Sequence, residues 1–150
     1  LAADDRADCE KRTRVSAAAC TRLLKASGLD AEELLQLHAL RGAAYRQIGK
    51  YDDSISDFTH AIGLAKKLEL PRIASDAHLL RGAVHSLKDD LRAALADFEE
   101  AVALEPNNDE THSAVQRTRA ALQAKEMLAK APPVLNAPRC FTFNNERFCD

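Results

Sequence analysis

A repeat with a period of 40 residues is the feature that most constrains the fold of this 150-residue chain. Residues 40–61 read LRGAAYRQIGKYDDSISDFTHA, and residues 80–101 read LRGAVHSLKDDLRAALADFEEA. Small and aromatic residues recur at equivalent places: Gly42 and Gly82, Phe58 and Phe98, Ala61 and Ala101. A fixed period of this length predicts helix pairs that stack in a row, with small residues allowing close approach and Phe filling the space between helices.

Local signals set the expected helix ends. A capping box at Asp30 and Glu33 opens the first helix of the repeats, and Gly49 ends it. The next helix should be capped by Asp52 or Asp53, because a short carboxylate can accept from the first free amides. Pro71 should begin the third helix, and the run Pro106-Asn107-Asn108 should separate the fourth helix from a fifth.

Two repeats are too few to bury a stacked core, so the flanking segments must cover the ends. Residues 14–27 contain Ala19, Leu23 and Ala26 at the spacing of Ala94, Phe98 and Ala101, which predicts a leading helix of an incomplete repeat. Residues 109–130 predict a terminal capping helix, with Ala114, Val115, Ala121, Leu122 and Leu128 on its apolar face. The expected total is about six helices.

The order of residues within each unit resembles the tetratricopeptide repeat: Gly42, Tyr45, Ser54, Phe58 and Ala61 in the first. The resemblance covers repeats at about 35–74 and 75–108, although the period is longer than the usual 34 and His85 replaces a Tyr. It implies an all-α solenoid over residues 1–130 that binds proteins in a concave groove. The groove residues that it implies are Ala39, Ala43, Arg46, Leu79, Ala83 and Arg117, together with Gln36, Asp76, Ser86 and Ser113.

Relatives that bind the acidic C-termini of chaperones use Lys and Asn at several groove positions, where this chain has Ala39 and Ala43. That activity is therefore not implied. A groove of small apolar residues is better suited to a packed helix or to aromatic side chains.

Two polar patterns each allow a structural and a functional interpretation. Arg41 and Asp57, like Arg81 and Asp97, are 16 residues apart, which favours ion pairs within the repeats over an arginine ladder for a ligand. His38, His78 and His112 share one repeat position; we expect core histidines rather than a metal ladder, because layers ~8–10 Å apart separate them. No catalytic motif is present, so we expect no enzyme, cofactor or metal.

The four cysteines form two local pairs, and their spacing favours disulfides Cys9–Cys20 and Cys140–Cys149 in an oxidising compartment. The alternative is a cytosolic protein with free thiols. On one straight helix Cys9 and Cys20 would be ~16 Å apart, so we expect Cys9 on a non-helical segment folded back over the first helix. Exported bacterial repeat proteins with an RG…DF pattern often carry an N-terminal Cys pair, and this chain is similar to them. The start LAADDRADCE suggests a processed product whose signal peptide has been removed.

The last residues differ from the rest of the chain. The segment CFTFNNERFC (140–149) can form a disulfide-clasped hairpin turning at Asn144-Asn145, with Phe141, Phe143 and Phe148 on one face. Residues 131–139 would be a Pro-rich linker. Two roles remain open for this tail of residues 131–150: a lid docked on its own solenoid, or an aromatic anchor in another protein.

A net charge of −2 gives no reason to expect nucleic acid, and no apolar run is long enough to span a membrane. We therefore expect a non-catalytic adaptor or accessory subunit of an exported, periplasmic assembly. The alternatives are a small-ligand binder that uses the groove and a redox protein that uses its Cys pairs.

Overall fold

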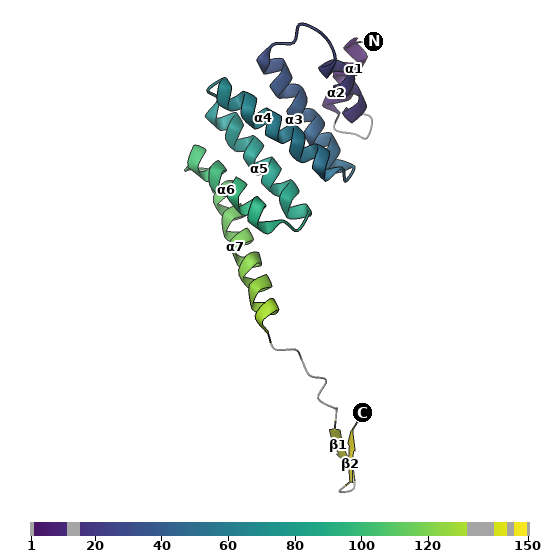
Figure 1. Ribbon diagram of the computed structural model, residues 1–150, viewed down its shortest axis with the longest axis vertical. Helices are drawn as coiled ribbons and strands as arrows, with labels where there is room; N and C mark the ends of the chain where they lie inside the picture. The colour runs from purple at the N-terminus through teal and green to yellow at the C-terminus, as the bar shows by residue number, and fades with distance from the viewer. Residues whose placement is uncertain (1, 12–15, 132–139, 144–145, 150) are drawn as a thin grey trace.

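The computed structural model describes residues 2–11, 16–131, 140–143 and 146–149, with the backbone alone for residues 2–3, 140–143 and 147–149. These residues form seven helices and two strands (Figure 1). The helices are α1 (Ala2–Glu10), α2 (Ser16–Leu24), α3 (Ala31–Gln47), α4 (Tyr51–Lys67), α5 (Pro71–Leu87), α6 (Leu91–Leu104) and α7 (Asp109–Lys130). The strands are β1 (Cys140–Phe143) and β2 (Glu146–Cys149).

The helices form a row in which each one packs against the helix before it and the helix after it. Short turns reverse the chain between α3 and α6, so that α3 and α5 run in one direction and α4 and α6 in the other (Figure 1). Helices α3 and α5 also contact each other, which places them on a common face. The predicted all-α solenoid is confirmed.

The N-terminal end differs from the expected arrangement, because Cys9 lies on a helix of its own. Helix α1 adds one helix to the expected six and pairs with α2 as a helical hairpin. The prediction that Cys9 lies on a non-helical segment was wrong. Two helices packed side by side bring Cys9 and Cys20 within disulfide distance, so no extended segment is needed. The leading helix is also shorter than expected: α2 ends at Leu24, and Ala26 is exposed beyond it.

Most of the predicted helix starts are present. The amide of Glu33 donates to Asp30 at 2.8 Å and the amide of Asp30 donates back to Glu33 at 3.2 Å, which is the expected capping box. Pro71 is the first residue of α5, and Asn108 caps α7. The cap of α4 was predicted wrongly: it is Lys50, and Asp52 and Asp53 lie in the first turn, where their charge still favours the helix dipole.

Close approach of paired helices explains the repeated glycines. Phe58 and Phe98 are 0% and 5% exposed, each between the helices of its own repeat. A Cβ atom at Gly42 would lie 3.2 Å from the Phe58 ring, and one at Gly82 would lie 2.6 Å from the Phe98 ring. The phenyl ring therefore occupies the space that a side chain at the glycine would need, as the repeat pattern predicted.

The second half of α7 was expected to pack more completely than it does. Ala114 and Val115 are buried beneath α6, but Met127 and Leu128 are 73% and 77% exposed. Helix α7 has 22 residues and runs back along the 14-residue α6, so its C-terminal turns extend past the start of α6 at Leu91 and have little neighbouring helix to cover them among the described residues.

Candidate functional site

Each repeat contains a buried aspartate that holds its two helices together. Arg41 donates to both carboxylate oxygens of Asp57 at 2.7 Å, and Nδ1 of His38 lies 2.8 Å from the same carboxylate. The second repeat copies this geometry: Arg81 donates to Asp97 at 2.9 and 2.7 Å, and Nδ1 of His78 lies 2.9 Å away. The predicted structural ion pairs are present.

The same arginines also connect neighbouring layers. Arg41 donates to the Thr21 hydroxyl of α2 at 3.1 Å, and Arg81 donates to the Thr59 hydroxyl of α4 at 2.8 Å. Burial alone would raise the pKa of Asp97, but hydrogen bonds from His78 and Arg81 outweigh it and lower that pKa. Since their donors are engaged within the stack, these arginines do not form a ladder for a ligand.

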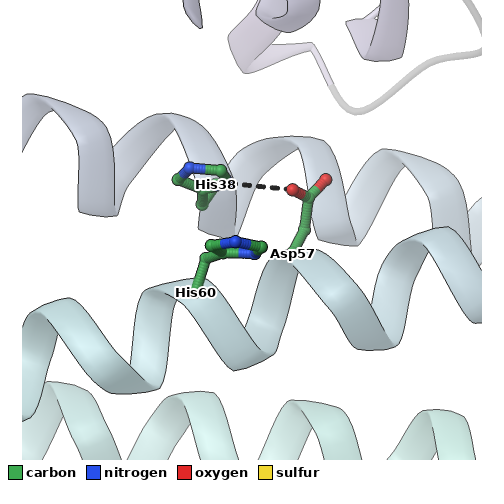
Figure 2. Close-up of side chains that lie close together, drawn as sticks. All are labelled: His38, Asp57 and His60. Carbon is green, nitrogen blue, oxygen red and sulfur yellow. Dashed lines mark hydrogen bonds and ion pairs between the residues drawn. The ribbon is translucent and has the colours of Figure 1, made fainter.

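A further residue, His60, lies beside the first of these networks. Its ring stacks on that of His38, with centroids 4.8 Å apart and planes 11° apart, beside the carboxylate of Asp57 (Figure 2). Nδ1 of His60 contacts the Ser56 carbonyl at 2.8 Å. A metal ion lies in the plane of an imidazole ligand, so two nearly parallel rings do not converge on one ion. Both oxygens of Asp57 are already hydrogen-bonded, which leaves this group a stacked polar cluster rather than a metal centre.

The alternative of a three-histidine ladder is not supported by the side chains either. His38 and His78 each contact the aspartate of their own repeat, as expected of core histidines. His112 differs, since it is exposed and its Nε2 lies 2.7 Å from the Pro106 carbonyl.

The groove is a pair of adjoining hollows over α3, α5 and α7. The first, of about 520 Å³, is strongly apolar and is lined by Glu32, Leu35, Gln36, Ala39, Leu40, Ala43, Leu70, Ile73 and Leu80. The second, of about 470 Å³, is lined by Arg46, Ala83, Ser86, Leu87, Leu91, Phe98, Ala114, Arg117, Thr118 and Ala121. Arg46 follows Ala43 on α3, and Ala83 follows Leu80 on α5, so the hollows lie one helical turn apart.

Most of the groove residues expected from the sequence line these hollows. They include Ala39, Ala43, Arg46, Ala83 and Arg117. Leu79 does not line either hollow, because it packs into the cluster around Phe98 and Val115. The sequence reasoning missed Ile73, which is 39% exposed in the first hollow, because α5 begins at Pro71, four residues before the second repeat that the sequence predicted from residue 75.

A wider hollow of about 800 Å³ lies away from this groove, between α2 and the end of α3. Its lining is more polar, and its cations have partners: Arg22 binds Asp5 and Lys50 lies 5.9 Å from the ring centre of Tyr45. We therefore take the apolar groove as the candidate site.

The cysteines separate into one pair whose side chains are described and one pair whose side chains are not. Cys9 and Cys20 form the predicted disulfide, with Cα atoms 4.9 Å apart and both residues fully buried. Strands β1 and β2 are antiparallel, with Cys140 opposite Cys149 and Phe141 opposite Phe148. The side chains of these four residues lie outside the described ones, as do the Pro-rich linker and the turn at Asn144-Asn145, so the second disulfide and the aromatic face stay predictions.

Comparisons with known proteins identify the repeats. The tetratricopeptide repeat model matches residues 35–68 and 75–108. The intervening six residues, 69–74, form the turn after α4 and the first turn of α5, so the longer period adds no separate element. No curated protein matches the chain. Among the described residues, no helix combines the length and apolar character that crossing a bilayer requires.

Several solved structures share the fold. The first tetratricopeptide domain of Spaghetti (RPAP3), bound to the HSP90 peptide SRMEEVD, is 25% identical with a TM-score of 0.59, over 72% of this chain and 78% of that one. The first such domain of human RPAP3 is 26% identical with a TM-score of 0.61, over 75% and 80%. The second human domain, in complex with the HSP70 peptide SGPTIEEVD, is 30% identical with a TM-score of 0.57, over 69% and 78%. Its repeats, its fold and these similarities show that the chain belongs to the tetratricopeptide repeat family.

Proposed function

We propose that this protein is a non-catalytic adaptor or accessory subunit of an exported, periplasmic assembly, and that it binds a partner protein in the groove over α3, α5 and α7. The observation that carries the proposal is the apolar first hollow, where Ile73 is exposed beside Ala39 and Ala43. The tetratricopeptide fold is typically a scaffold for protein interactions, and two of the similar domains bind peptides.

The expected partner segment differs from those peptides. Both of them end in EEVD, which is acidic, whereas the first hollow presents small and branched apolar side chains. Small residues let a second helix approach closely, and apolar burial contributes about 25 cal/mol per Å². An amphipathic helix or a segment with aromatic side chains fits this lining better than a cluster of carboxylates.

The buried disulfide supports the proposed location. Disulfides persist in oxidising compartments such as the periplasm. Cys9 and Cys20 are both inaccessible, and thiol exchange needs access to a sulfur atom, so a structural role is favoured over the alternative of a redox protein.

Site-directed changes on the two faces of the solenoid test the groove. Ala39→Arg puts a charge into the first hollow, and Ala103→Arg is the matched control on an exposed position of α6. Ala103→Arg should melt like the wild type, and Ala39→Arg should stay folded with a lower melting temperature, because Ala39 is partly packed against Ala61 and Ile62. Only Ala39→Arg should lose a partner protein captured from the native compartment. Equal capture by the two variants would contradict partner binding in the groove. If a small molecule instead raised the melting temperature of the wild type, the alternative of a small-ligand binder would be favoured.

The tail is the second proposed contact. We propose that Phe141, Phe143 and Phe148 form an aromatic anchor, held by a Cys140–Cys149 clasp, for a partner surface; the register of β1 and β2 supports a shared face. A Phe141→Ala, Phe148→Ala double variant should melt normally and lose partner capture, with a cost of ~2 kcal/mol or more. A lower melting temperature with normal capture would identify the tail as an intramolecular lid.

A further inference from the structure

Two arginines at one end of the groove have no partner among the residues that the structure describes. Arg46 on α3 and Arg117 on α7 line the second hollow together, beside the apolar Ala83 and Leu87. Neither forms an ion pair or a hydrogen bond within the described part of the chain, whereas Arg41, Arg81 and Arg119 all do. Leu87 is 56% exposed in the same hollow, so the two cations border apolar surface that water still covers.

Two acidic residues that line neither hollow, Asp76 and Glu110, lie toward the opposite end of the groove. Asp76 lies near the start of α5. Burial is the main cause that raises its pKa, and the nearby carboxylates of Glu105 and Glu110 raise it further. Arg72 offsets part of this effect, but Asp76 has no hydrogen-bond or ion-pair partner among the described side chains. Glu32 adds a further carboxylate at the start of α3, in the first hollow.

The spacing along the helices places both ends on one face. Glu110 and Arg117 on α7 are seven residues apart, as are Asp76 and Ala83 on α5, which is about two turns or ~10 Å. Apolar side chains of the two hollows lie between the acidic and the basic ends. Along α5 and α7 the charge of the groove therefore changes from negative, near the helix starts, to positive, about two turns later.

We propose that the groove binds an amphipathic helix whose charges are segregated, with its carboxylates at Arg46 and Arg117 and its cations at Asp76 and Glu110. This deepens the proposed function, because it assigns the charge pattern and the direction of the partner. Charges arranged in this way contribute specificity and fix the register, while apolar contacts supply most of the affinity.

Two synthetic helical peptides of equal composition test the direction. Both are about 16 residues long, capped at their termini and apolar on one face; the first has Lys in one half and Glu in the other, and the second alternates them. The first should bind the full chain about fivefold more tightly at low salt, and the difference should shrink in 0.5 M salt, because exposed ion pairs are weak and screened. A nitroxide on the acidic half should broaden the amide signals of Arg46 and Arg117 more than that of Asp76.

Matched protein variants separate this direction from general charge effects. Arg46→Gln with Arg117→Gln should abolish the fivefold preference, and Lys66→Gln with Lys67→Gln, which removes two exposed cations at the end of α4, should keep it. Equal binding of the two peptides, or a nitroxide effect centred on Asp76, would overturn the proposed direction and leave the groove intact as a docking site. Failure of both peptides to bind at millimolar concentration would overturn the groove and the direction together.

Discussion

Three glycines within helices provide a quantitative test of how the repeats pack. Gly63 on α4 has no atom within 4 Å of the position that a Cβ would take, the nearest atom to such a Cβ at Gly42 is 3.2 Å away, and at Gly82 it is 2.6 Å away. Replacing Gly by Ala in a helix gains about 1 kcal/mol of intrinsic helix propensity at each site. The three substitutions therefore differ chiefly in what the new methyl group contacts.

The expected order of stability follows from these distances. Gly63→Ala should raise the free energy of unfolding by about 0.5–1 kcal/mol, because nothing opposes the propensity gain. At Gly82 the methyl group must displace the buried Phe98 ring, and overpacking costs about 1–3 kcal/mol, which outweighs the gain. Gly82→Ala should therefore be up to about 2 kcal/mol less stable than the wild type, and Gly42→Ala should lie between the two.

Urea unfolding, followed by circular dichroism, measures these differences as shifts of the urea concentration at the unfolding midpoint. The comparison holds when the slope of the free energy of unfolding against urea concentration is the same in all variants. In a thermal melt each kcal/mol should correspond to about 2–4 °C for a chain of this size. Combining Gly82→Ala with Phe98→Leu should recover part of the loss if the ring causes it. Gly82→Ala as stable as Gly63→Ala would refute the close contact between α5 and α6.

Three further predictions concern the core, the buried acids and the disulfide. Phe98→Ala should lower stability by about 3–5 kcal/mol, and wild-type melting would contradict the repeat packing. Because the pKa of Asp97 is lowered in the folded state, its contribution is complete above about pH 4–5 and is lost as pH falls through the folded-state pKa. Asp97→Asn should cost about 3 kcal/mol of unfolding free energy at pH 7 and should make stability fall less steeply as the pH is lowered. If stability fell with pH as in the wild type, Asp97 would not be a cause of the loss in acid. Replacing Cys9 and Cys20 by Ser should cost about 2–3 kcal/mol, measured by urea unfolding, and an unchanged midpoint would contradict a stabilising bridge.

The sequence by itself determined the helical repeat, because its periodic small and aromatic residues act locally or within one helix pair. Gly42 and Phe58 are 16 residues apart, close enough in sequence that a single helical hairpin brings them together. The capping box at Asp30 was predictable because it lies within four consecutive residues, and the ion pairs of Asp57 and Asp97 because they recur with the repeat.

Only the tertiary structure decided the features that depend on neighbouring layers. The stacking of His60 on His38, the place of Ile73 in the groove and the packing of Leu79 away from it all depend on how far one helix is rotated against the next. Helix α1 was missed because its first turns are polar and gain stability from the disulfide to α2 rather than from a strong apolar pattern. Periodicity specifies which face of a helix is apolar, but the rotation and offset between layers come from the sum of many side-chain contacts, and this sum decides which residues line the groove.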